Sequence, residues 1–213
     1  MVCPICGKRK AKRFCPAKGE LICAVCCGTE REVTIDCPSD CTHLLAARRY
    51  EREHQSPVDP KDDPFPGVDL PRGLMSERGN VLNGIGFTVL KFAREHRELT
   101  DRDVFDAAQA LGETYRTLGS GLYYEKPPAA PLPQGLYAAI AEFLNEVKKA
   151  EAERAGFPSL KDSEIFQLLV FFSRLAKFNA NGKRLSRAFL DSLRTQYPPD
   201  PEITKEAPRI IMP

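Results

Sequence analysis

Cysteine is absent after residue 41, and histidine is scarce throughout, with three in the 213 residues. The chain beyond residue 54 therefore has no thiol nucleophile and no cysteine ligand, and its one histidine is His96. The same region lacks a Gly-rich phosphate loop, an HExxH motif and the Glu and ExxH ligands of a di-metal bundle. His96 adjoins charged residues at the edge of an apolar stripe, which is typical of a helix-end surface residue and not of a catalytic base. We therefore expect no enzymatic activity.

Long apolar runs are also missing, so the sequence predicts no transmembrane helix and no membrane partner. Residues 1–2 leave no room for a charged leader before the first cysteine, and we therefore expect a reducing, cytoplasmic location. Disulfides are rare in that compartment, and a thioredoxin-like redox pair would need a βαβ context that the sequence lacks. The cysteines therefore favour metal binding over disulfides, redox chemistry or an iron–sulfur cluster.

Eight cysteines are present between residues 3 and 41, enough for two tetrahedral sites of four thiolates each. The first pair lies in a CPxCG motif, which is typical of a zinc knuckle whose backbone N–H groups point at sulfur and whose Gly7 takes a positive φ. A second CxxC pair can face the first and complete one tetrahedron. Predicted site one therefore consists of Cys3, Cys6, Cys23 and Cys26. Predicted site two takes the remaining thiols, with His43 as an alternative ligand: Cys15, Cys27, Cys37 and Cys41.

The interleaved order of these ligands resembles the B-box type of zinc finger, a cross-brace module that binds two zinc ions, over about residues 3 to 43. Lys18 stands where that family has its fourth ligand, so Cys27 or His43 would have to substitute for it. Cys15-Pro16 is also similar to the HIT-type zinc finger, a related interleaved arrangement. Both resemblances imply a protein-interaction module and not a catalyst.

A basic run follows the first CxxC pair and consists of Lys8, Arg9, Lys10, Lys12 and Arg13. Residues 1–54 contain ten Lys and Arg and seven Asp and Glu, a formal charge of +3. Two zinc ions with eight thiolates would bring this charge to about −1, so we expect the basic run mainly to offset the thiolates. Nucleic acid is the alternative partner of the run, but Phe14 is the one aromatic residue near it and offers little base-stacking surface.

Composition divides the chain into four expected parts. Residues 1–54 form the double zinc module, closed by a short helix at 44–53. Residues 55–74 contain five prolines and four aspartates, which predicts a semi-rigid, acidic linker. Residues 75–197 show helical periodicity, and residues 198–213 are a Pro-rich tail.

Five apolar stripes of helical spacing run through residues 75–197, and they predict helices at about 81–96, 104–118, 136–147, 165–176 and 185–197. Thr100-Asp101 offers a helix start and Gly119 a helix end for the second of these. The fourth stripe is apolar on all sides around residues 168–172, so it should lie at the centre of the bundle. The expected fold is thus a small zinc-stabilised cross-brace module plus an all-α helical bundle of about five helices.

The connection at residues 119–133 exceeds the usual two to eight residues of a bundle loop. Tyr123, Tyr124 and the polyproline-prone segment after them predict either an aromatic, groove-binding contact patch or a plug over one end of the bundle. The whole sequence favours a non-catalytic, zinc-dependent interaction or adaptor protein that binds a protein partner. A nucleic-acid-associated zinc protein that uses the basic run remains the alternative.

Overall fold

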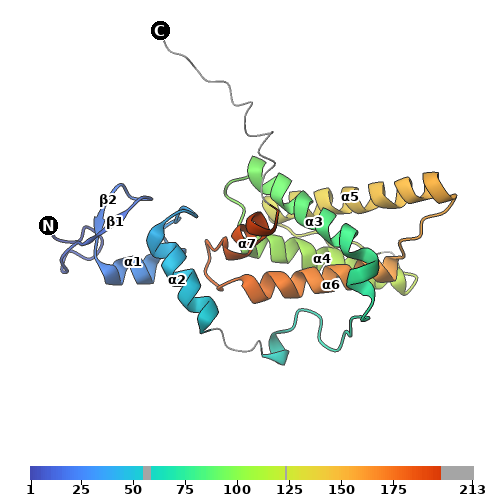
Figure 1. Cartoon of the computed structure of the whole chain (residues 1–213), viewed down its shortest axis with the longest axis horizontal. Helices are drawn as coiled ribbons and strands as arrows, with labels where there is room; N and C mark the ends of the chain where they lie inside the picture. Colours follow the sequence, from blue (N-terminus) through green and yellow to red (C-terminus); the bar gives the residue numbers. More distant parts are fainter. Residues whose placement is uncertain (55–58, 123, 198–213) are drawn as a thin grey trace, which may run out of the picture.

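The computed structural model describes residues 1–54, 59–122 and 124–197. It is mostly helical with one two-stranded sheet, and the cysteine-rich region lies at one end of a helical bundle (Figure 1). The expectation of mainly α structure beside a small cysteine-rich module is confirmed. The described ranges hold seven α-helices instead of about five: five in the bundle, α2 (Thr42–Glu53), which matches the closing helix expected at 44–53, and α1 (Ala24–Glu30), which was not expected.

The N-terminal region is built on a short hairpin, in which β1 (Arg13–Cys15) pairs antiparallel with β2 (Glu20–Ile22). Gly19 closes the hairpin turn at φ +69°, in the left-handed region that glycine enters without steric cost. Cysteines then mark the element boundaries. Cys23 follows β2 and its sulfur accepts from the Cys26 amide at the start of α1, while Cys41 is the residue directly before α2.

The bundle consists of α3 (Leu74–Glu95), α4 (Asp101–Gly119), α5 (Pro131–Ala155), α6 (Asp162–Asn179) and α7 (Ala188–Gln196). The Thr100 hydroxyl and the Asp103 carboxylate form a reciprocal capping box, so the predicted start of α4 is confirmed. Pro131 occupies the first turn of α5, where its missing N–H has no helical partner to lose. No helix of the described ranges is long and apolar enough to cross a membrane.

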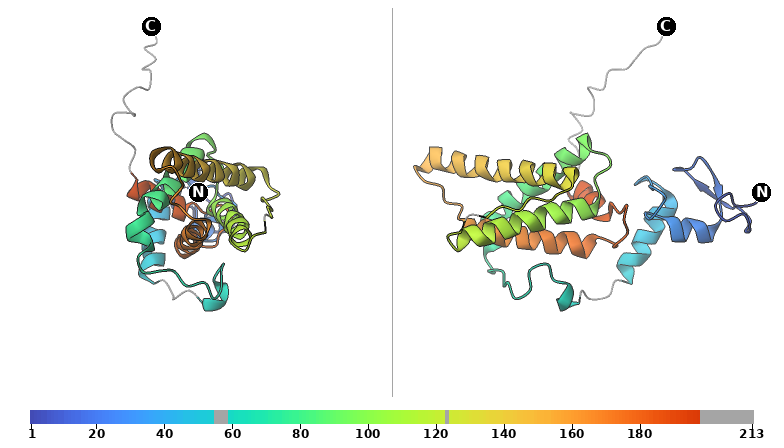
Figure 2. Two further views of the ribbon diagram at one scale, coloured as in Figure 1. Left: turned by 90° about the vertical axis from the view of Figure 1, so that its right-hand side faces the viewer. Right: turned by 180° about the vertical axis from the view of Figure 1, so that it is seen from behind.

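Four of these helices pack in a closed ring, in which α4 and α3 each contact both α5 and α6 (Figure 2). The predicted central segment of α6 is buried on most sides, with Leu168, Leu169, Val170 and Phe172 fully covered. Phe172 meets Phe189 of α7 edge to face, which closes the end of the ring nearest the cysteine-rich region.

The Pro/Asp-rich segment before α3 lies against the bundle over its described residues, 59–73. Phe65 is 3% exposed and packs edge to face on Phe166 of α6, next to Gly112 of α4, where a Cβ would meet the Phe65 ring at 2.7 Å. The Arg174 guanidinium binds the Asp63 carboxylate at 2.7 Å and also donates to two backbone carbonyls of this segment. These contacts attach the segment to α4 and α6.

A buried polar cluster joins the N-terminal region to the bundle. Glu32 is 1% exposed, and its carboxylate accepts from Arg48 of α2 at 2.6 Å and from Asn181 at 2.7 Å. The backbone oxygen of Glu32 also accepts from the amide of Leu185 at 2.8 Å. Arg48 continues to Asp191 of α7 at 2.5 Å, so one guanidinium links the two parts of the chain. We refer to Glu32, Arg48, Asn181 and Asp191 as the junction cluster.

Candidate metal centre

The four cysteines of predicted site one converge in the structure. Cys3 and Cys6 lie in the turn that precedes β1, where the Gly7 amide donates to the Cys3 carbonyl at 2.8 Å. Gly7 has φ +63°, as the CPxCG motif predicts. Cys23 and Cys26 lie at the junction of β2 and α1. All four sulfur atoms fall within 4.8 Å of one another.

The spacing fits a metal ion better than a disulfide. A tetrahedral zinc with Zn–S bonds of about 2.3 Å holds its sulfurs about 3.8 Å apart, and Cys6 and Cys23 are separated by 4.0 Å. A disulfide requires about 2.05 Å between sulfurs, and all eight cysteines are free. Cys3, Cys23 and Cys26 are buried and Cys6 is half-buried, so the four thiols enclose one point that is shielded from solvent.

The thiols of this group respond differently to their surroundings. Hydrogen bonds from the backbone amides of Lys8 and Arg9 lower the pKa of Cys6 to about 6, so its thiolate is available at neutral pH. Burial and the neighbouring thiols raise the pKa of Cys26 to about 12. Burial acts to raise the pKa of Cys3, but backbone amides led by that of Cys23 outweigh it and lower the value. A divalent cation at the centre would remove this conflict, because it stabilises all four thiolates together.

Predicted site two is assembled less completely. Cys15 ends β1, Cys27 lies in α1, and Cys37 and Cys41 flank a turn in which the Cys41 amide donates to the Pro38 carbonyl at 3.0 Å. Burial raises the pKa of Cys37, and the negative charges of Cys41, Glu32 and Cys15 add to that increase. Within the described ranges, however, no second set of three or more candidate ligand atoms lies within 4.8 Å.

Lys18, which stands at the family's fourth ligand position, is exposed in the hairpin turn, where its amide donates to the Cys15 carbonyl at 3.1 Å. The alternative ligand His43 is half-buried in the first turn of α2. Cys27 accepts from the Arg31 guanidinium at 3.9 Å.

The other candidate residues lie apart from the four-cysteine group. Lys8, Arg9, Lys10 and Lys12 are exposed, and Arg13 is half-buried. His96 ends α3 and packs on Phe92 with ring centroids 4.2 Å apart, as a helix-end residue does. Tyr123 lies outside the described residues.

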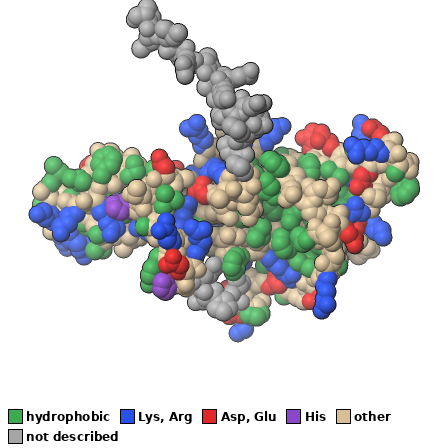
Figure 3. Space-filling view, in the orientation of Figure 1, with side chains coloured by type: hydrophobic (Ala, Val, Ile, Leu, Met, Phe, Trp, Pro, Cys, Tyr) green, Lys and Arg blue, Asp and Glu red, His purple; other side chains and the backbone are tan. Residues whose placement is uncertain are grey.

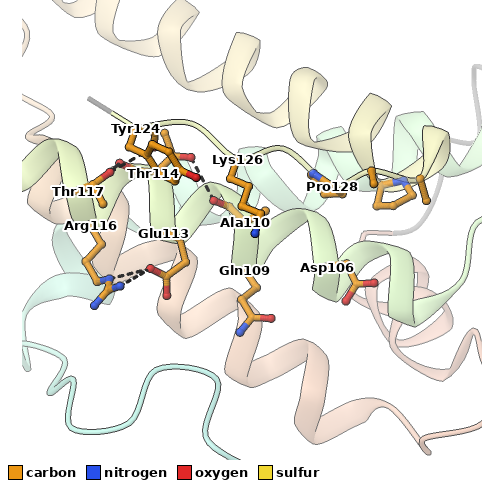
Figure 4. A pocket seen from close by; sticks show the side chains of 13 residues that line it. Asp106, Gln109, Ala110, Glu113, Thr114, Arg116, Thr117, Tyr124, Lys126 and Pro128 are labelled. Atoms are coloured by element: carbon orange, nitrogen blue, oxygen red, sulfur yellow. Dashed lines mark hydrogen bonds and ion pairs between the residues drawn. The ribbon is translucent and has the colours of Figure 1, made fainter. Parts of the chain in front are cut away.

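Tyr124 is exposed, and its carbonyl accepts from the Thr117 hydroxyl at 3.3 Å. Together with Lys126 and Pro128 it forms one wall of a cavity of about 600 Å³, whose other wall is α4 (Figure 4). On the α4 wall, Glu113 is paired with Arg116 at 2.6 Å. The long connection thus lines a hollow, and nothing in its lining selects a particular ligand.

Sequence reasoning missed the junction cluster. Glu32 is the one non-glycine residue with positive φ among the described residues, at +55°, and it is separated from Asn181 by 149 residues. Arg48 lies on the buried side of α2 with Leu44, but an arginine in an amphipathic helix is usually expected at the surface. No local sequence pattern predicts a contact between residues so far apart in the chain.

Comparison with protein families, with curated proteins and with solved structures finds no match to this chain. The metal assignment therefore rests on the sulfur geometry and the chemistry of the ligands.

Proposed function

We propose that the protein is a non-catalytic zinc protein whose N-terminal module presents a protein-binding surface on a helical bundle. The observation that carries the proposal is the convergence of four cysteine sulfurs within 4.8 Å. Four thiolates around one zinc ion leave no coordination position for water or substrate, which is the arrangement of a structural site and not of a catalytic one.

Zinc is favoured over other metals by the ligands themselves. Thiolates are soft ligands that select zinc, copper(I) or iron–sulfur clusters, whereas calcium, magnesium and manganese prefer oxygen. The sulfur–sulfur distances between the two CxxC pairs are close to those around one tetrahedral zinc ion. A redox role would require an accessible thiol pair, and three of the four sulfurs belong to buried residues.

We further propose a second zinc ion per chain, held by Cys15, Cys37, Cys41 and Cys27. Burial raises the pKa of the Cys37 thiol, and nearby Cys41 and Cys15 add to that increase. Cys27 follows Cys26 directly in α1, so a change of its side-chain rotamer can redirect its sulfur from Arg31. The interleaving of the two sites would then match the B-box-like order of ligands.

Metal analysis of protein purified without chelator tests the stoichiometry. We expect about two zinc ions per chain, a decrease to about one for Cys37→Ser, and X-ray absorption with sulfur ligands only. His43→Ala is the matched control and should keep both ions, whereas Cys41→Ala should lose or weaken one. One zinc ion per native chain would reject the second site. If Cys41→Ala keeps both zinc ions and His43→Ala loses one, the fourth ligand of the second site would be the His43 imidazole and not the Cys41 thiolate.

Interaction is tested by affinity capture from the native cell with the tagged full chain and the Cys26→Ser variant. We expect at least one protein that wild type retains, that Cys26→Ser loses and that nuclease treatment does not remove. Captured proteins that depend on nuclease-sensitive material would instead support the nucleic-acid alternative. That alternative is favoured by one observation, which is that the cations Lys8, Arg9, Lys10 and Lys12 form no ion pair within the described residues.

A further inference from the structure

The outward side of the hairpin combines exposed apolar side chains with exposed lysines. The segment from residue 10 to residue 15 alternates strictly in burial, with Lys10, Lys12 and Phe14 exposed and the residues between them buried or half-buried. Side chains two residues apart in an extended segment share one face, so these three point to the same side.

Both flanks of this segment add apolar groups. Phe14 is directly opposite Leu21 in the β1–β2 register, and Val2 is directly opposite Lys10 in an isolated bridge. Directly opposed residues in an antiparallel pair have Cβ atoms about 4.5–5.5 Å apart and share a face. Val2, Lys10, Lys12, Phe14 and Leu21 therefore form one continuous surface, which we call the outer hairpin face.

Among residues 1–54, 59–122 and 124–197, nothing covers this surface. Phe14 is 58% exposed, Val2 57% and Leu21 37%. Figure 3 shows apolar and Lys or Arg side chains gathered over the N-terminal region, with few acidic groups among them. Lys10 and Lys12 have no acidic partner among the described residues, and Lys8, Arg9 and Lys18, which are near them in the sequence, are exposed as well.

We propose that the outer hairpin face binds an acidic segment of another protein that carries large apolar side chains on either side of its carboxylates. This inference rests on the proposed interaction function and names the partner's chemistry. Apolar groups lie at both ends of the face, with Lys10 beside Val2 at one end and Lys12 between the two ends. From Val2–Lys10 to Phe14–Leu21 the face extends about 13 Å, four residues at about 3.3 Å each.

The composition of the face favours a protein over nucleic acid. Interfaces with nucleic acid are strongly polar and use cations against phosphate, and unspecific single-strand binding uses several stacked aromatic rings. Here aliphatic Val2 and Leu21 accompany the single ring of Phe14. Protein interfaces instead place aromatic and aliphatic groups at buried contact points and surround them with charge that steers the partner.

A phage-displayed library of random 16-residue peptides, selected on the zinc-loaded full chain, tests the proposal without a known partner. Counter-selection uses the double variant Phe14→Ser, Leu21→Ser. We expect enriched peptides of net negative charge with at least two large apolar residues. In fluorescence anisotropy their affinity should fall at least tenfold for Phe14→Ser and for Lys10→Ser with Lys12→Ser. Raising the salt concentration should weaken binding to wild type more than to the lysine variant.

Matched controls are available on the bundle. Phe157→Ser removes an aromatic group that is 64% exposed, and Lys91→Ser with Lys149→Ser removes two exposed lysines. These variants should bind the selected peptides like wild type, and every variant should keep its zinc and its circular dichroism spectrum. The two hairpin variants leave all eight cysteines in place, so a loss of binding would not report a lost metal site.

Three results would overturn the inference. One is a selection without acidic enrichment, and another is peptides whose binding survives both hairpin variants. Such peptides would leave the interaction function standing and move it to another surface. The third is binding of a 30-nucleotide DNA strand, or of vesicles with 30% phosphatidylserine, that is tighter than binding of the selected peptides. If the lysine variant loses that binding and Phe14→Ser keeps it, the result would contradict the protein-interaction function itself.

Discussion

The bundle and the N-terminal region differ in the residues that fill their interiors. In the bundle α6 packs against α3, α4 and α7, and Phe172, Phe189 and Leu168 are almost completely buried. In the N-terminal region, four of the seven residues in the buried cluster are cysteines, and the others are Ala11, Ile22 and Ile35. A region of this size buries little apolar surface, and in the proposed function bonds from sulfur to zinc supply the missing stability. Under that proposal, one part of the chain is held by an apolar core and the other by metal ligands.

Chelation should separate the two regions most strongly. Removing zinc takes away a binding free energy on the order of 10 kcal/mol from residues 1–54, and these residues should unfold while the bundle keeps its helices. Hydrogen exchange read by mass spectrometry after incubation with a chelator measures both regions at once. Residues 75–213 expressed alone should likewise unfold cooperatively. Loss of bundle protection upon chelation would show that the two regions share one folding unit.

A cavity in the bundle should destabilise the bundle and leave the zinc content of the N-terminal region unchanged, the opposite of chelation. Phe172 is 1% exposed and packs on Phe189, so Phe172→Ala should lower the free energy of unfolding of the bundle by about 3–5 kcal/mol. Thermal denaturation measures the change, and metal analysis should find the zinc content unaltered. Phe157→Ala, at a ring that is 64% exposed, is the control and should change the stability little. A zinc loss in Phe172→Ala would contradict the separation.

The junction cluster should respond to Arg48→Met, which leaves the buried Glu32 carboxylate without its cation. Removing one partner of a buried ion pair costs about 3 kcal/mol, and here that cost falls on the contact between the regions. We expect faster hydrogen exchange at the Leu185 amide, which donates to the Glu32 carbonyl, with both zinc ions retained. Arg52→Met, at an exposed position on the same helix, serves as control. Unchanged exchange at Leu185 would mean that the regions stay joined without this pair.

Acid should act on the bundle through a smaller effect. The hydrogen bonds from Arg174 lower the pKa of Asp63, so its contribution to stability is present above the unfolded value near 3.8 and is lost as the pH falls through the lower folded value. The partial exposure of the pair limits this contribution to about 1 kcal/mol or less. Pulse proteolysis of residues 59–73 between pH 5 and pH 2.5 measures it. Asp63→Asn should lack this part of the pH dependence. If its pH profile is identical to that of wild type, other carboxyl groups cause the dependence.

Much of the bundle was predictable because its signals are local. The start of α4 follows from Thr100 and the helical stripes from apolar spacing, and the structure places the fully apolar part of α6 in the core. The convergence of Cys3, Cys6, Cys23 and Cys26 was predictable in part for the same reason, since each CxxC pair is a local turn. Phe65 was placed in the predicted linker, and only its neighbours Gly112 and Phe166 reveal that it is buried. The helix α1 was not anticipated, because seven residues that include Gly28 and Thr29 carry little helix propensity.

The double link through Glu32 has a consequence for avidity. Its side chain and its backbone oxygen both accept hydrogen bonds from the bundle side of the junction, so the N-terminal region is attached there at two points. Two domains on a flexible tether reach a common target at an effective concentration set by the length of that tether. A junction attached at two points instead presents the outer hairpin face and the bundle surface together. A partner that contacts both would therefore lose little further rotational entropy when the second contact forms. Such a partner would be selected by the distance between its two contact points as well as by their chemistry.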